Sequence, residues 1–432
     1  MKNLVQRRKA YLQNLFRTID VPEDLTTVTD IDTAGEVDPD EADLGPQAVA
    51  AIWDATRNLY RTGVYPLLSL CLRRRGKIVL NRSLGHYQDG KVASINTPIC
   101  LYSASKAVTA VLVHLLAEQG RVNLLNPVSY YIPAFAANGK GSITIHQLLA
   151  HRGGVPSLPE GMELETLCDH DAVLKIICEA EPTDHQARIQ AYHAVTSGFI
   201  MNELIKVTAG QNAQQYINQY IRRPMGMRYF RYGLTAREQA NVAINTATGP
   251  DIGLVNKVLT GILGAHPQLA VEMTNDPRFY RALIPSVNLF ATAEEVSRFY
   301  QMLLDHGRWQ DKQILDPLTV QRAVRPLGKS EFDKTLMLPM RYSAGFMLGG
   351  TPFGIFGAQS QYAYGHLGYA NIFCWADPLR DISVSLINTG KLALGPHLKA
   401  LPELMGALSI HCTPVADMET DLSVYRRRRP VT

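Results

Sequence analysis

The sequence is poor in cysteine, has little net charge and contains no long apolar run, and these shortages exclude several classes of protein. The six cysteines include no CxxC pair and lie mostly among apolar neighbours, so we expect reduced core thiols rather than disulfides or a zinc site. The 43 basic residues barely exceed the 39 acidic ones, which does not favour a nucleic-acid partner. No apolar run reaches the ~20 residues that a membrane span requires, so no membrane association is expected.

Both ends of the chain are locally charged. Residues 1–9 are basic but lack the apolar stretch of a signal peptide, which leads us to expect a cytoplasmic protein. Residues 426–429 are four consecutive arginines, and a solvated tail is a simpler interpretation of them than a site for an anionic partner.

Several common catalytic motifs are also missing. The sequence contains no GxSxG, so the nucleophile elbow of α/β-hydrolases is excluded. It contains no HExxH, no GxxxxGK[ST], and no GxGxxG that opens a helix after a strand. No metal and no organic cofactor is therefore implied.

Strand signals lie toward the two ends of the chain and helix signals lie between them. Short apolar runs flank a turn at Gly76, and a second hairpin pattern covers residues 372–387. Apolar periodicity typical of helices dominates the stretch between, at residues 107–118, 145–149, 193–208, 212–221 and 293–304. This order predicts one sheet assembled from distant segments, with helices that cover its faces and form an inserted lobe.

The strongest local feature is a serine and a lysine three positions apart, Ser103 and Lys106, at the start of an apolar helix. This spacing places both side chains on one face of the helix. Residues 107–116 are apolar except for Thr109 and His114, which predicts a buried helix in which a lysine is costly unless it loses its proton. A neutral lysine could accept the serine proton, whereas the alternative is a helix-capping serine beside a solvent-facing lysine.

Two further segments carry candidate groups. Tyr192 directly precedes a predicted helix, and a nearby lysine ammonium would lower its pKa and let the phenol carry protons. His366 stands between Gly365 and Gly368, which let a strand edge approach a ligand closely and offer an N–H to an oxyanion. The alternative for this segment is a turn with a half-buried histidine. His151 follows a short helix and faces a turn, so we expect it to have a structural role.

Together these residues resemble the serine β-lactamase and penicillin-binding-protein superfamily, and most of all its class C-like esterases, the family VIII carboxylesterases. The resemblance extends over roughly residues 50–410. Residues 124–133 are similar to the segment that follows the nucleophile helix in these proteins. Residues 143–155 resemble the family's LLxHxSG segment, and residues 290–299 resemble its TAxDLARF helix.

The resemblance implies a fold of the α+β or α/β class, with a central antiparallel sheet flanked by helices and an inserted, mostly helical domain. It places the active site in the cleft between the two domains. The expected divisions are a lead-in helix and linker at residues 1–45, an α/β domain at 46–120 and 285–432, and a helical domain at 121–284.

The resemblance also implies roles for the three candidate side chains. Ser103 would be the acylated nucleophile, Lys106 its partner in proton transfer, and Tyr192 the tyrosine of the family's second motif. No metal or organic cofactor belongs to this chemistry, and the expected partner is a small-molecule ester.

The third family motif falls on His366 and Gly368, and the backbone N–H groups of Ser103 and Tyr369 would form the oxyanion hole. Ala194 stands where β-lactamases have an asparagine, and His366 stands where they have a lysine. Loss of a charge-assisted hydrogen bond costs roughly 1.5–3 kcal/mol, so a carboxylate-bearing β-lactam would bind less well. Neutral esters need neither contact.

These departures favour a serine carboxylesterase that hydrolyses short-chain esters through an acyl-enzyme on Ser103. A β-lactamase, a D-amino-acid peptidase or an acyltransferase on the same fold is the alternative, and a catalytically idle scaffold is a more distant one. The sequence leaves open the natural ester, the oligomeric state, and whether Lys106 or Tyr192 is the resting general base.

Overall fold

The computed structural model of this protein describes residues 17–415. The first 16 residues of the predicted lead-in helix and linker (1–45) and the predicted arginine tail at residues 426–429 lie outside the described residues.

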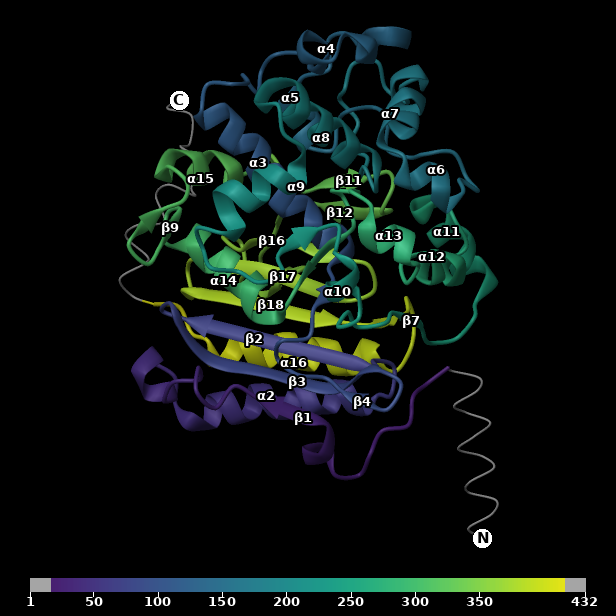
Figure 1. The fold of residues 1–432 in the computed structure, drawn as a ribbon. Helices are drawn as coiled ribbons and strands as arrows, with labels where there is room; N and C mark the ends of the chain where they lie inside the picture. The colour runs from purple at the N-terminus through teal and green to yellow at the C-terminus, as the bar shows by residue number, and fades with distance from the viewer. Residues whose placement is uncertain (1–16, 416–432) are drawn as a thin grey trace.

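The centre of the molecule is an antiparallel sheet built from both ends of the chain, which confirms the predicted fold class (Figure 1). The strands stand in the order β1 (Thr29–Ile31), β3 (Lys77–Gln88), β2 (Leu67–Arg74), β18 (Ile382–Asn388), β17 (Ile372–Asp377), β16 (Tyr364–Gly368) and β13 (Met347–Leu348). Leu70 of β2 pairs with Leu386 of β18, so the two predicted hairpins meet at the middle of the sheet. Strand β1 comes from the segment that we expected to be a linker.

The side chains of β2 alternate between two buried clusters, which explains why helices cover both faces of the sheet. Leu68, Leu70 and Leu72 belong to one buried cluster, while Leu67 and Cys71 belong to another on the opposite face. Successive side chains of a strand point to opposite faces, so buried apolar residues on both faces of β2 require helices on both sides of the sheet.

Helices α2 and α16 pack together against one face, and α14 packs against the other (Figure 1). Helix α14 begins at a capping box in which Thr292 and Glu295 each bond the other's backbone N–H. The helices are α2 (Pro46–Arg61), α3 (Ser105–Glu118), α4 (Val128–Tyr131), α5 (Ile145–Leu149), α6 (Leu164–Cys168), α7 (His170–Glu179), α8 (Thr196–Ala209), α9 (Ala213–Ile217), α10 (Ala236–Gln239), α11 (Gly253–Leu263), α12 (Pro267–Met273), α13 (Pro277–Arg281), α14 (Ala293–Leu304), α15 (Pro317–Val324) and α16 (His397–His411).

The remaining strands are short. They are β4 (Lys91–Val92), β5 (Ile99–Cys100), β6 (Arg231–Tyr232), β7 (Thr246–Ala247), β8 (Leu289–Ala291), β9 (Arg308–Trp309), β10 (Lys312–Gln313), β11 (Glu331–Asp333), β12 (Leu338–Met340), β14 (Phe353–Gly354), β15 (Gly357–Ala358) and β19 (Gly390–Lys391).

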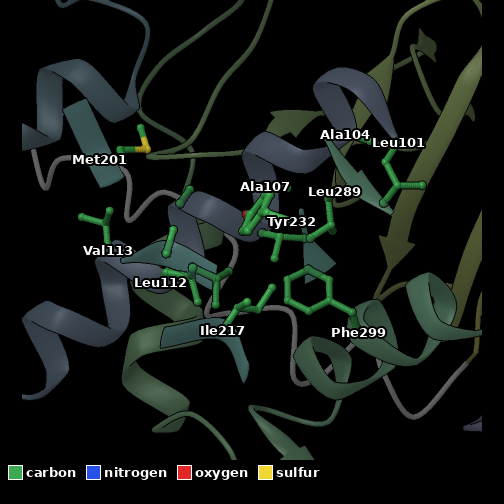
Figure 2. Close-up of a cluster of buried hydrophobic side chains, with 14 of the residues drawn as sticks. Leu101, Ala104, Ala107, Leu112, Val113, Met201, Ile217, Tyr232, Leu289 and Phe299 are labelled. Atoms are coloured by element: carbon green, nitrogen blue, oxygen red, sulfur yellow. The ribbon is translucent and has the colours of Figure 1, made fainter. Parts of the chain in front are cut away.

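Helix α3 lies in the interior, as its apolar sequence predicted. Every residue from Ser105 to Leu116 is buried. Figure 2 shows side chains of this helix clustered with residues of distant elements, among them Tyr232, Ile217 and Phe299. Contacts on all sides hold the first turn of α3 in place, and this turn carries the candidate serine and lysine.

The helix predicted at residues 193–208 begins later than expected, at Thr196. The backbone N–H groups of Ala191 and Ala194 donate to the carbonyl oxygens of His151 and Pro156. Residues 191–194 are therefore tied to another loop and do not extend the helix, so Tyr192 lies on a loop four residues before α8.

All six cysteines are free thiols, as predicted. Among the helices of residues 17–415, none combines the length and apolarity needed to cross a membrane.

Candidate active site

The turn that carries Ser103 is a short 3-10 turn (Tyr102–Ala104) between β5 and α3. Tyr102 has a positive φ of 47°, a strained conformation for a residue with a side chain. Ala104 is the N-cap of α3 and no side chain caps this end. Ser103 is therefore not the capping serine of the alternative interpretation, and its half-buried hydroxyl is available for other contacts.

Lys106 points to Ser103 across one turn. Its Nζ lies 3.0 Å from Ser103 Oγ and donates to the carbonyl oxygen of Ser286 at 3.1 Å. The side chain is only 5% exposed, and burial lowers the pKa of Lys106 well below its usual value. A neutral amine at this distance accepts a hydroxyl proton, so the pair has the arrangement of a nucleophile and its base.

Tyr192 lies on the other side of Lys106, whose Nζ is 4.9 Å from the centre of the tyrosine ring. Burial raises the pKa of Tyr192, while the nearby Ser103 hydroxyl acts to lower it. The phenol oxygen is buried and lacks a hydrogen-bond partner of good geometry. Our expectation that a lysine ammonium would lower this pKa is wrong, because burial outweighs the other influences on the phenol.

Asp333 holds the backbone of Tyr192 in place, and sequence reasoning missed it. Its Oδ1 accepts from the N–H groups of Tyr192, Thr335 and Leu336 at 2.9–3.1 Å, and its Oδ2 accepts from the Tyr342 hydroxyl at 3.0 Å. The residue is fully buried. Locally it looks like any aspartate that organises a turn, so no sequence signal connects it with a tyrosine more than a hundred residues away.

Three buried histidines surround the tyrosine and lysine. The ring of His151 lies 4.7 Å from that of Tyr192, and the backbone N–H of His193 donates to His151 Nδ1. Burial and the neighbouring His193 lower the pKa of His151 well below its usual value. His151 thus contacts a candidate catalytic side chain, beyond the structural role that the sequence suggested.

His366 lies behind Tyr192 rather than in the substrate space. Its ring is 6.0 Å from the Tyr192 ring, and its Nδ1 is 2.7 Å from the carbonyl oxygen of Leu367. Burial, followed by the charge of Lys106, lowers the pKa of His366 to about 3. Because strand side chains alternate, Leu367 takes the position that lines the cavity, where we expected His366 to contact substrate.

Gly368 allows β16 to approach the serine turn. A Cβ atom at this position would lie closer to the Leu101 carbonyl oxygen than van der Waals contact permits. The approach brings the ring of Tyr369 to 5.7 Å from that of Tyr102, next to Ser103. The predicted pair of oxyanion donors, at Ser103 and Tyr369, therefore comes from two adjacent segments.

Asn388 of β18 and Lys391 of β19 support the turn that follows β16, at residues 369–371. Asn388 Nδ2 donates to the carbonyl oxygens of Ala370 and Asn371, two residues with positive φ. Lys391 Nζ donates to the Asn388 carbonyl oxygen and, at 3.4 Å, to that of Tyr369. Burial lowers the pKa of Lys391 to about 7. Sequence analysis did not single out either residue.

A cavity of about 330 Å³ opens beside the serine. Ser103, Tyr192, Gly368 and Tyr369 all line it, together with residues of α11, of α12, and of the segment at residues 157–167, which runs into α6. No charged side chain is among the lining residues, and most of the lining is apolar. The cavity therefore suits an uncharged molecule whose reactive group meets Ser103.

Within residues 17–415, one group of side chains has the spacing of metal ligands, His170, Asp171 and Glu203 on α7 and α8. Lys206 Nζ lies 2.8 Å from Glu203 and 3.4 Å from Asp171. A lysine ammonium that contacts both carboxylates competes with a cation, and the group lies outside the cavity lining. The geometry gives no support for a metal in the chemistry at Ser103.

Comparison with protein families gives a match to the beta-lactamase model over residues 52–400. The chain belongs to the beta-lactamase family. One curated relative, Esterase/beta-lactamase LipL of Mycobacterium tuberculosis, is 26% identical over 306 residues, which cover 68% of this chain and 69% of LipL.

Two solved structures share the fold. A family VIII carboxylesterase matches with a TM-score of 0.73 at 24% identity, over 86% of this chain and 98% of the other. A penicillin-binding-protein homologue from Caulobacter crescentus matches with a TM-score of 0.71 at 22% identity, over 84% of this chain and 97% of the other. These likenesses show the fold, and the match to the beta-lactamase model confirms the family that the motifs indicated.

Proposed function

We propose that this beta-lactamase-fold hydrolase is a serine carboxylesterase that forms an acyl-enzyme on Ser103. The observation that carries the proposal is the 3.0 Å contact between Ser103 Oγ and the Nζ of Lys106, a buried lysine whose pKa is lowered by burial, beside a cavity with no charged lining residue. The name of LipL, an esterase/beta-lactamase, and the carboxylesterase among the structural neighbours support ester hydrolysis.

In the acylation step, Ser103 Oγ attacks the ester carbonyl carbon while its proton passes to Lys106 Nζ. The backbone N–H groups of Ser103 and Tyr369 stabilise the negative charge that develops on the carbonyl oxygen. The bond to the leaving alcohol then breaks, and the alkoxide takes the proton from Lys106 through the neutral Tyr192 phenol. Since the pKa of Tyr192 is raised, this phenol donates and relays protons rather than serving as the resting base.

In the deacylation step, water attacks the acyl carbon and gives one of its protons to Lys106. The bond to Ser103 Oγ breaks, the serine recovers its proton, and the carboxylic acid leaves. Every atom comes from the ester and one water molecule, so the reaction needs no cofactor.

A β-lactamase is the second candidate, because LipL carries that name as well. The cavity argues against it, since neither Ala194 nor any other lining residue offers a charged group to the carboxylate of a β-lactam. Acyl transfer would use the same acyl-enzyme, with an added alcohol attacking the acyl carbon in place of water.

The test is a paired assay of p-nitrophenyl butyrate and a chromogenic cephalosporin with the wild type, Ser103→Ala and Ser157→Ala. Ser157 is the matched control because it also lines the cavity. We expect ester turnover that disappears in Ser103→Ala and persists in Ser157→Ala, with little cephalosporin hydrolysis. Turnover that survives in Ser103→Ala would refute the nucleophile, and fast cephalosporin turnover would favour the β-lactamase. A wild type that neither turns over an ester nor becomes phosphonylated by an activated phosphonate would be an idle fold.

A further inference from the structure

The cavity beside Ser103 has more apolar wall than a short ester can cover. Its lining includes residues of α11 and α12, Leu336 and Leu338, and residues between 157 and 167, a segment that runs into α6. Four methionines, Met162, Met273, Met340 and Met347, are spread around the lining. Methionine is flexible and polarizable, so such a lining adapts to a flexible apolar ligand.

Helix α11 is an apolar helix that is not packed into the core, so its part of the wall remains accessible to a ligand. It has no buried residue, although eight of its eleven positions are apolar or glycine in the sequence GLVNKVLTGIL. Leu259, Ile262 and Leu263 face the cavity and are only half-buried. An apolar ligand would remove this surface from water, which is the main source of affinity for such sites.

Two polar groups of the wall, the hydroxyls of Tyr102 and Thr274, already form hydrogen bonds within the protein. The hydroxyl of Tyr102 is hydrogen-bonded to Thr274 Oγ1 at 2.7 Å, and Thr274 Oγ1 in turn bonds the Val271 carbonyl oxygen. A carboxylate or ammonium on the ligand would lose its water here without gaining a charged partner. Charged and strongly polar chains are therefore disfavoured.

We propose that this cavity binds a linear apolar chain of the substrate, so that the protein selects esters of medium and long chains over the short esters first expected. This inference rests on the proposed ester hydrolysis at Ser103. It assigns to α11 and α12 a role in specificity that is separate from the chemistry.

The experiment measures kcat/KM for two series of esters, p-nitrophenyl acylates and alkyl acetates, each with chains of two to twelve carbons. Each methylene that enters the cavity should raise kcat/KM about fourfold until the cavity is full, after which the values level off. The series that rises identifies whether the acyl or the alcohol side of the ester occupies the cavity. If neither rises, the inference is overturned.

Two variants test the walls directly, with the acetate ester of p-nitrophenol as the internal reference. Leu259→Glu places a charge in the cavity and should lower kcat/KM for the preferred long ester at least tenfold more than for the acetate. Leu254→Glu is the matched control on the same helix, because Leu254 is 77% exposed and does not line the cavity. Ala270→Phe leaves less room in the cavity, so kcat/KM should stop rising at a shorter chain length. Equal loss for long and short esters in both cavity variants would overturn the inference.

Failure of this inference is distinguishable from failure of the proposed function. Ser103-dependent hydrolysis of acetate with a flat chain-length series would leave the esterase standing and remove the chain site. If no ester is turned over, 1-decanol serves as a probe that requires no chemistry. A rise in the melting temperature with 1-decanol that Leu259→Glu abolishes and Leu254→Glu retains would support the chain site, and no rise with the wild type would overturn it.

Discussion

The strongest prediction concerns Asp333, which accepts four hydrogen bonds, one of them from the backbone N–H of Tyr192. Each hydrogen bond to a charged group is worth about 1.5–3 kcal/mol, and a buried donor left without a partner is costly. Replacing Asp333 with alanine removes all four acceptor contacts, whose loss the desolvation of the carboxylate partly offsets, so we expect a destabilisation of about 4–8 kcal/mol. Asp333→Asn keeps an oxygen for the three backbone N–H groups and should cost about 2 kcal/mol.

The assay combines thermal unfolding with ester kinetics. Unfolding entropy is roughly 2 cal/mol/K per residue, so for a chain of 432 residues each kcal/mol corresponds to a shift of about 1 °C. Asp333→Ala should therefore melt about 4–8 °C lower than the wild type. Since a displacement of about 1 Å at a reacting group can cost 10²-fold, kcat should fall at least tenfold, and by less in Asp333→Asn.

Asp184→Ala is the control for this prediction. Asp184 also accepts three backbone N–H groups, at Gln186, Arg188 and Ile189, but it lies in an exposed loop where water replaces the lost acceptor. Its melting temperature and kcat should change less than those of Asp333→Ala. A melting temperature of Asp333→Ala within 1 °C of the wild type, with unchanged kcat, would refute the reasoning.

Three further outcomes are expected. Gly368→Ala should lower kcat about 10²–10³-fold, because the new Cβ displaces β16 from the serine turn. Gly406→Ala, whose new Cβ would lie in open space, should not lower kcat. Equal kcat values for the two variants would contradict the need for close contact between β16 and the serine turn. Tyr192→Phe keeps the ring but removes the proton relay, so kcat should fall about 10²–10⁴-fold with little change in KM; a twofold loss would show that Lys106 acts without it. The pKa of Lys391 is lowered to about 7, and between that pH and its usual value of 10.5 the unfolded chain holds a proton that the folded chain lacks. Stability should therefore rise with pH across this window in the wild type relative to Lys391→Met, as measured by melting temperatures at pH 7, 8.5 and 10, and parallel pH profiles would contradict it.

Local patterns were enough to predict the elements whose residues interact along the chain. Helices α5 and α14 have the predicted bounds, because a capping residue and apolar periodicity act within one segment. The contact between Ser103 and Lys106 was predictable for the same reason, since a helix places residues three apart on one face. Local sequence singled out Tyr192 and the segment with Gly368 as candidates, but only the resemblance to a family joined them to Ser103, because nothing local connects them with it.

The sequence by itself determined the fold class, the family and the serine–lysine pair, all of which depend on residues near one another or on motifs in a set order. Tertiary structure alone decided that Tyr192 is a neutral phenol, that Asp333 holds it, and that Leu367 rather than His366 faces the cavity. It also decided that the cavity lined by α11 contains no charged side chain. The physical reason is that burial, pKa and cavity shape depend on which distant segments pack around a group, and a linear pattern of residues does not contain that information.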